Sequence, residues 1–348
     1  MKYRFNKLHL LLLLSFILIG CQNVSMTSSD PNVIDAGSPN LLAMDHGFVY
    51  RSNNNSIDYF DINKDTSVKI ISASLCDGLP LEGDMCQGNL ERISSSSGFF
   101  TDDSERIYVF TEYYGEEGQR KTQLLRMNQD GQKLVFNPTD IEGTIQAAVQ
   151  MKGDLYVIEQ QESMEKTLVK RLSMQGRLLE EIEFPGKVIE LIPDADKLYF
   201  RQGEPDVFNQ LVEFYDTEQK TFGQTSVKTA GYMRVLDGNI IAVERDESVD
   251  YTQKEAFFVV LHPLEGESVV LENNAGNVFL LDDEIITTHT GLEALDQKLQ
   301  RTVYRYEMDG TKKGEFSVGE GHEVVGVSAG HLICLDHHDE YHCYSLKD

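Results

Sequence analysis

The chain has 348 residues, with 31 Lys or Arg against 57 Asp or Glu, which gives a net charge of −26. A field of this sign repels nucleic-acid phosphates and anionic lipid head groups, so the composition argues against nucleic acid as a partner and against a basic membrane-binding patch. Hydrophobic residues make up 41% of the chain, enough to bury a large core in one domain or two.

The amino-terminal residues have the pattern of a signal peptide. Three basic residues precede an apolar run over 8–19 that is too short for a comfortable membrane span. The run ends in Leu-Ile-Gly-Cys at 18–21, which resembles a bacterial lipobox. The resemblance implies a signal peptide at 1–20, lipidation of Cys21 and a tether over 21–30, since two or more acyl chains anchor a protein stably. The alternative is a chance cysteine after a signal peptide.

Removal of residues 1–20 takes away three basic and no acidic residues, so the mature chain carries 28 basic against 57 acidic residues, or −29. We therefore expect an exported protein whose only membrane contact is the lipid on Cys21. Residue 22 is Gln, which resembles outer-membrane lipoproteins of enteric-type bacteria. The predicted location is the cell envelope, at the periplasmic face of the outer membrane or on the cell surface.

Seven segments of the remaining chain share a turn rich in Gly, Asp or Asn followed by an apolar, β-rich run. Equivalent positions are spaced by 58, 48, 43, 42, 45 and 47 residues and are Tyr50, Tyr108, Tyr156, Tyr199, Ile241, Ile286 and Ile333. Each run is preceded by one apolar stretch and followed by two more. Four short strands per repeat are typical of a β-propeller blade. The sequence predicts an all-β, seven-bladed β-propeller over 31–348; an irregular pair of β-sandwiches would not explain the regular spacing.

Two segments resemble known propeller units. Residues 124–136 and 303–316 look like the strand, Asp-Gly turn and strand units of bacterial lipoprotein-type and low-density-lipoprotein-receptor-like propellers. The resemblance covers Pro31 to Asp348 and implies a fold without a function. The chain has no Trp, and it has neither the kelch double glycine nor the D-x-D-x-D-G calcium loop.

The last repeat has three strands, expected at 324–329, 331–336 and 341–346. We expect 31–37 to supply its fourth strand and so close the ring. If the strands of a blade are called A to D from the axis outward, the B-to-C loops and the D-to-A connections lie on one face, here called the top face. The tether then enters at the opposite, bottom face.

Five of the B-to-C loops are long and acidic, and long loops on one face of a rigid scaffold are where binding usually occurs. Simple solvated hairpin tips are the alternative. The candidate top-loop binding residues are Glu116, Glu117, Glu162, Glu204, Asp206, Asp246, Glu247, Asp250 and Glu293.

A second set of polar residues falls on the upper or middle part of the A strands, near the axial mouth. It consists of Arg92, Lys187, Glu190, Arg234, Asn277, His322 and Glu323. Such a mixed set can bind a small ligand or carry acid–base chemistry. The alternative is channel-lining polarity with ordered water.

The cysteines other than Cys21 form two predicted disulfides, which fit an exported protein. Cys76 and Cys86 bracket an insertion between the first two blades. Cys334 and Cys343 would lie directly opposite each other if a two-residue turn at 338–339 joined their strands. The histidines near this turn fall on different rungs, so we interpret them as part of a solvated turn and expect no metal site.

No nucleophile motif or phosphate loop is present, so we expect no catalytic residues and no cofactor. The favoured hypothesis is a monomeric, non-enzymatic envelope lipoprotein that binds a protein or glycan partner through its acidic top face. One alternative is a propeller hydrolase or lyase acting on a glycan or peptide at the axial mouth. The other is a cation-dependent adhesin that uses the acidic loops as ligands.

Overall fold

The structure is a computed structural model of the chain. It describes residues 41–44, 46–51, 57–71, 92–93, 98–102, 104, 106–114, 120–127, 133–136, 141, 145–159, 165–203, 210–250, 257–273, 277–281, 283–288, 302–336, 338 and 340–346. Within these ranges, no helix is long and apolar enough to cross a membrane.

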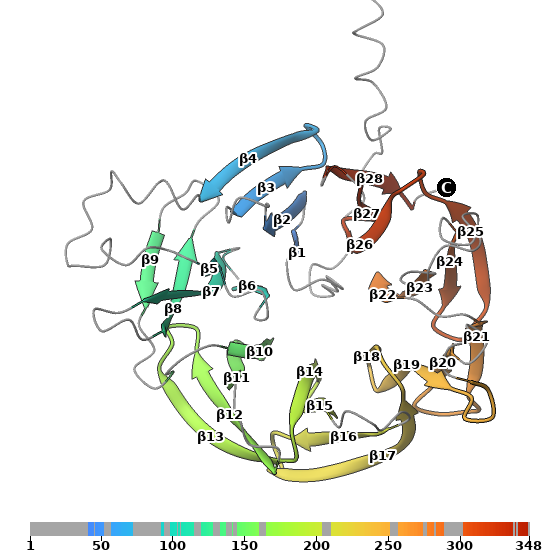
Figure 1. Cartoon of the computed structure of the whole chain (residues 1–348), viewed down its shortest axis with the longest axis horizontal. Coiled ribbons are helices and arrows are strands. Elements are labelled where there is room, and N and C mark those ends of the chain that lie inside the picture. The colour runs from blue at the N-terminus through green and yellow to red at the C-terminus, as the bar shows by residue number, and fades with distance from the viewer. Residues whose placement is uncertain are drawn as a thin grey trace, which may run out of the picture.

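The described chain is all-β and forms seven antiparallel sheets arranged as the blades of a ring (Figure 1). The first three blades contain β1 (Leu41–Met44), β2 (Gly47–Arg51), β3 (Ile57–Asp61) and β4 (Thr66–Ile71); β5 (Arg92–Ile93), β6 (Phe99–Thr101), β7 (Ile107–Tyr114), β8 (Arg120–Met127) and β9 (Lys133–Phe136); and β10 (Ile145–Met151), β11 (Asp154–Glu159), β12 (Lys166–Ser173) and β13 (Leu178–Pro185).

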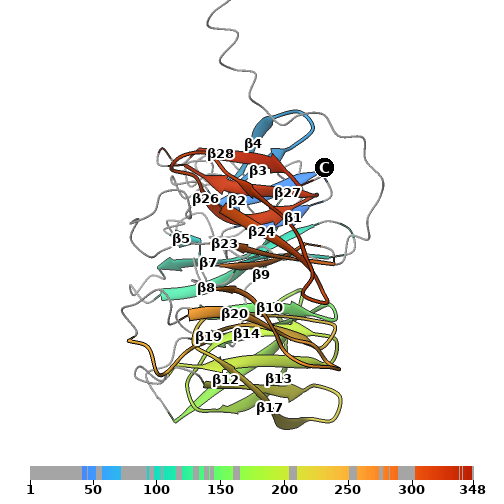
Figure 2. The ribbon, with the colours of Figure 1, turned by 90° about the vertical axis from the view of Figure 1, so that its right-hand side faces the viewer.

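Blades 4 to 7 continue the series in chain order. They contain β14 (Val188–Asp194), β15 (Lys197–Gln202), β16 (Gln210–Asp216) and β17 (Thr221–Thr229); β18 (Met233–Leu236), β19 (Asn239–Arg245), β20 (Phe257–His262) and β21 (Val269–Asn273); β22 (Val278–Leu281), β23 (Glu284–Thr288), β24 (Thr302–Glu307) and β25 (Lys312–Ser317); and β26 (Glu323–Ser328), β27 (His331–Leu335) and β28 (Tyr341–Ser345). The strands run across the thickness of the ring (Figure 2).

The seven predicted apolar runs are confirmed as the B strands of the blades, the second from the axis. They are β2, β7, β11, β15, β19, β23 and β27. The turns that precede them are tight because several have two residues with positive φ. In one such turn, φ is 51° at Lys152 and 78° at Gly153; in another, it is 50° at Asp237 and 78° at Gly238. This is the geometry of two-residue hairpins, in which glycine bears the second positive φ without strain.

Each blade is buried on both faces because it packs between two others. Seven clusters of buried hydrophobic residues lie within the described chain, and each draws on two neighbouring blades. Adjacent residues on one B strand enter different clusters: Tyr156 packs toward blade 4 and Val157 toward blade 2. This two-sided burial explains why the B strands are continuous apolar runs rather than alternating ones.

One of the seven clusters joins the last blade to the first and closes the ring, as Figure 1 shows for β26–β28 beside β1–β4. Phe48 and Ile333 are fully buried in it, and the Ser328 hydroxyl donates a 2.7 Å hydrogen bond to the Gly47 carbonyl. The predicted closing strand at 31–37 lies outside the described residues. The described part of blade 7 has three strands, and packing of its inner strand beside β1 closes the ring.

The register of the last hairpin differs from the prediction. Cys334 pairs with His342, and Cys343 pairs with Ile333, so the two cysteines lie on opposite faces of the blade. Neither forms a disulfide. The predicted Cys334–Cys343 bridge is therefore wrong. The connection is one residue longer than the predicted two-residue turn, and a register shift of one residue moves each side chain of β28 to the other face of the blade relative to β27. The predicted bridge between Cys76 and Cys86 lies outside the described residues.

The Cys334 thiol is part of the core between blades 6 and 7. Burial raises its pKa to about 12, so it stays protonated at neutral pH. A buried, protonated thiol behaves as a small hydrophobic side chain rather than as a nucleophile or a metal ligand.

Candidate functional site

The top edge of the ring is defined by strand direction. In blade 5, Met233 at the start of β18 pairs with Ala242 near the end of β19, and the Val243 N–H donates to the Tyr232 carbonyl at 2.9 Å. The D-to-A connection and the B-to-C loop therefore meet at the same edge. The same arrangement in blade 7 brings together residues that are distant from each other along that blade.

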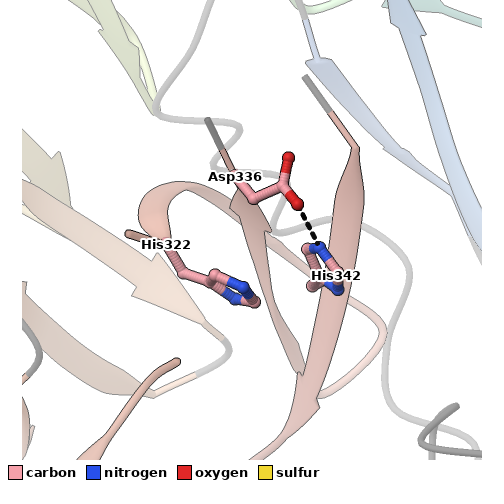
Figure 3. A group of neighbouring side chains, drawn as sticks. All are labelled: His322, Asp336 and His342. Carbon is pink, nitrogen blue, oxygen red and sulfur yellow. Dashed lines mark hydrogen bonds and ion pairs between the residues drawn. The ribbon is translucent and has the colours of Figure 1, made fainter. Parts of the chain in front are cut away.

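Three chemically active side chains meet at the top edge of blade 7. His322 precedes β26, Asp336 follows β27 and His342 lies on β28, and one potential ligand atom from each falls within 4.8 Å of the others. Asp336 Oδ2 lies 3.1 Å from His342 Nε2, and the two imidazole rings stack with centroids 4.2 Å apart (Figure 3). We call these three residues the blade 7 cluster.

The connection between β27 and β28 fixes the Asp336 carboxylate. Its Oδ1 accepts hydrogen bonds from the backbone N–H groups of His338 at 2.8 Å and Glu340 at 2.9 Å. The Glu340 N–H, with smaller contributions from His342 and the His338 N–H, outweighs desolvation and holds the pKa of Asp336 well below its usual range. The carboxylate is therefore ionised, with Oδ2 directed toward the imidazoles.

A tyrosine orients the other imidazole. Tyr344 Oη lies 2.7 Å from His322 Nδ1 and accepts a 2.8 Å hydrogen bond from the Gly319 N–H. The Tyr344 contact therefore fixes the orientation of the His322 ring through Nδ1, with Nε2 on the other side of the ring.

Of the predicted axial-mouth residues, Glu190 and Arg234 lie together between blades 4 and 5. Glu190 Oε2 is 3.1 Å from Arg201 Nε, and Glu190 Oε1 is 3.8 Å from Arg234 Nη1. Both oxygens of this carboxylate thus face arginines. Such pairing favours a structural role for Glu190 over the acid–base role that a free carboxylate could take.

The other members of the axial set lie at or just before the starts of the inner strands β5, β14, β22 and β26. The Lys187 carbonyl accepts the Gly203 N–H, and the Asn277 backbone is hydrogen-bonded to Thr288. Glu323 is exposed. Arg92 lies on β5, but its side chain is outside the described part of the structure. With His322 in blade 7, the set is distributed over the inner strands of five blades.

Three of the predicted top-loop residues are described, and all three are exposed: Asp246, Glu247 and Asp250. The carboxylate of Asp246 accepts the Ser248 hydroxyl at 2.6 Å and its N–H at 2.9 Å, and these bonds lower the pKa of Asp246. The remaining six predicted positions lie outside the described residues: Glu116, Glu117, Glu162, Glu204, Asp206 and Glu293.

The sequence did not predict Tyr232 as a surface residue. Its side chain is 51% exposed at the top edge of blade 5, where the acidic loop begins. Tyr232 directly precedes Met233, the first residue of β18. Because both residues are hydrophobic, the sequence pattern does not show that one is exposed and the other buried. The grouping of His322 with Asp336 and His342 was also missed, since it depends on three different connections meeting at one edge.

The fold and these sites define a seven-bladed β-propeller with polar clusters along its top edge. No family model and no curated protein matches the chain.

Solved structures resemble the fold. The β-propeller domain of the trilobed protease from Pyrococcus furiosus, described as having an open velcro topology, gives a TM-score of 0.54 at 14% identity over 89% of this chain and 95% of that one. Virginiamycin B lyase from Staphylococcus aureus gives 0.53 at 11% identity over 88% and 94%. A quinoprotein alcohol dehydrogenase-like protein from Bacteroides thetaiotaomicron gives 0.52 at 10% identity over 87% and 73%. At these identities the likeness concerns the fold alone.

Proposed function

We propose that the protein is an exported lipoprotein held to the cell envelope by the lipid on Cys21, and that its propeller is a non-enzymatic platform for a protein or glycan partner. The observation that carries the proposal is the top edge of blade 5. There the half-exposed Tyr232, whose carbonyl accepts the Val243 N–H, precedes β18 at the same edge at which β19 leads into the exposed Asp246, Glu247 and Asp250.

The chemistry of this edge indicates what the partner offers. Tyrosine provides a large, rigid contact surface with a polar tip, which makes it frequent at the centre of binding interfaces. The three carboxylates of the loop after β19 attract basic side chains or accept hydrogen bonds from sugar hydroxyls. The expected partner therefore carries Lys or Arg groups, or hydroxyls, near an apolar face.

The environment of Glu190 supports binding over hydrolase or lyase activity at the axial mouth. Both of its oxygens face arginines, so its carboxylate is engaged in ion pairs within the ring. The propeller is in turn a rigid support, because all seven interfaces between blades are packed with buried hydrophobic residues within the described chain.

Neutralising the acidic loop of blade 5 should abolish most of the partner binding. We expect the triple variant Asp246→Asn, Glu247→Gln, Asp250→Asn to capture far less envelope partner than the parent protein in affinity purification of the full chain. Adding Tyr232→Ala should weaken capture further, since it removes the aromatic contact. The measurement is quantitative capture of each protein or glycan species from solubilised envelopes.

A matched control carries the same charge change on the bottom face. Glu265, Glu267 and Asp283 are exposed on bottom-face turns of blades 5 and 6. The variant Glu265→Gln, Glu267→Gln, Asp283→Asn should retain capture. If the two triple variants lose capture equally, net charge rather than the top edge recruits the partner, and this part of the proposal fails.

The lipid anchor is tested separately. With Cys21→Ala, the protein should move from the membrane fraction to the soluble envelope fraction, because the body of the chain is strongly acidic and is not attracted to anionic lipid. Fractionation followed by immunoblotting measures the shift, and mass spectrometry of the parent protein should find acyl chains on Cys21. Unchanged membrane association of the variant would contradict anchoring by lipid.

A further inference from the structure

The blade 7 cluster has the composition of a transition-metal site. Two imidazoles and one carboxylate are the ligand set of many three-ligand sites, which leave a further position for water or substrate. Its members come from three separate places in the last blade: the connection before β26, the end of β27 and the start of β28. No other arrangement of this kind occurs among the described residues.

The separations match what a small divalent ion requires. Two ligands each about 2.1 Å from a tetrahedral ion lie roughly 3.4 Å apart, and Asp336 Oδ2 and His342 Nε2, which are joined by a hydrogen bond, are 3.1 Å apart. All three ligand atoms lie within 4.8 Å of one another. The rings stack at an interplanar angle of 26°, so rotation about the bond between Cβ and the ring is needed to direct both lone pairs at one point.

The surrounding hydrogen bonds hold the ligands as metal sites do. Asp336 Oδ1 is held by two backbone N–H groups, whereas Oδ2 faces His342 Nε2 and would exchange that hydrogen bond for a bond to the metal. Tyr344 Oη accepts a hydrogen bond from the Gly319 N–H, and its second lone pair can accept another from a protonated His322 Nδ1. In that tautomer His322 Nε2 presents a lone pair. Partners of this kind outside the ligand set fix ring orientation and tune metal affinity.

We propose that His322 Nε2, Asp336 Oδ2 and His342 Nε2 bind one divalent transition-metal ion, with zinc, a frequent occupant of sites built from His and carboxylate ligands, as the ion. The ion would join the approach to β26, the end of β27 and the start of β28. It would therefore fix the top edge of the terminal blade, which packs directly against blade 1. The inference is independent of the proposed partner binding.

The test is binding of zinc alone to the full-length protein in detergent, by isothermal titration calorimetry. We expect one saturable site per chain and a rise in the melting temperature. Tyr344→Phe should weaken the affinity about 10–100-fold, the usual effect of losing an orienting partner. His322→Ala and His342→Ala should weaken it more. Cobalt(II) bound to the parent protein should give the visible absorption of a four-coordinate ion.

The control is His338→Ala, which removes an exposed histidine from the same hairpin but outside the cluster. It should leave the affinity unchanged. Equal loss in His338→Ala and His342→Ala would assign binding to adventitious histidines and overturn the proposal, as would absence of saturable binding in the parent protein. Circular dichroism without metal separates ligand loss from misfolding; Asp336→Asn, which keeps the side-chain shape, provides a second ligand variant if an alanine variant does not fold.

Discussion

Replacing Phe48 with alanine should lower the free energy of unfolding by about 3–5 kcal/mol, the range found when a buried phenylalanine is truncated. Phe48 is fully buried where blade 7 meets blade 1, with its ring centroid 5.2 Å from that of Phe60 and 5.5 Å from that of Tyr341. The change leaves a cavity in the interface that closes the ring. Urea unfolding followed by circular dichroism, or by tyrosine fluorescence because the chain has no Trp, measures the loss.

Two variants serve as controls for ring closure. Phe110→Ala removes an equally buried ring between blades 2 and 3 and should cost a similar amount. Phe222→Ala removes a side chain that is 45% exposed and should cost much less. If Phe48→Ala behaved like Phe222→Ala, the interface between the last and first blades would not contribute to stability, which would contradict a closed ring.

Replacing Arg305 with methionine should cost about 3 kcal/mol at neutral pH, since removal of one partner leaves a poorly compensated carboxylate. Arg305 contacts Glu284 through Nε at 2.8 Å and Nη2 at 2.9 Å, and its Nη1 donates to the Leu346 carbonyl at 2.7 Å. The side chains of Arg305 and Glu284 are only 15% and 12% exposed. Arg305 thus connects blade 6 to the end of blade 7.

The cost of this substitution should depend on pH. Burial alone would raise the pKa of Glu284, but the interactions with Arg305 and Lys313 outweigh burial and lower it. A lowered folded-state pKa contributes stability that is present above the unfolded value of about 4.3 and lost as pH falls through the folded value. The difference between the parent protein and Arg305→Met should therefore be largest near pH 7 and shrink at acid pH.

Lys166→Met is the matched control for this prediction. Lys166 and Glu183 also form an ion pair, at 2.6 Å, but their side chains are 60% and 62% exposed. Its loss should cost less than about 1 kcal/mol, because water screens exposed pairs. Urea titrations at several pH values compare the two. A cost for Arg305→Met that is independent of pH would show that Glu284 contributes little through its charge.

The sequence predicted the blades well because each B strand is buried on both faces. Such a strand must be apolar at every position, and a tight turn with positive φ must precede it, so Lys152-Gly153 and the run after it were recognisable. The same pattern of continuous burial predicted β7, although its inner neighbour is divided into two short strands, β5 and β6. The A strands were harder to place because they are partly polar, and those of blades 1, 2, 5 and 6 have four residues or fewer.

The register of the hairpin formed by β27 and β28 could not be predicted from the sequence. A two-residue turn was predicted, which set Cys334 opposite Cys343; in the structure, backbone hydrogen bonds to the Asp336 side chain stabilise a longer connection and shift the register by one residue. Nothing in the local pattern distinguishes the two turns. The choice depends on how one carboxylate is satisfied, and it decides which face each cysteine occupies.

The sequence by itself determined the number of blades, the position of their B strands and the acidic character of the chain, because burial on two faces and tight turns leave a local pattern. Only the tertiary structure decided which polar side chains meet. His322, Asp336 and His342 come together, and Glu190 faces two arginines, because strand ends from separate connections converge at one edge of the ring. Side chains at such edges have no periodicity, so their meeting is fixed by packing and register rather than by any run of residues.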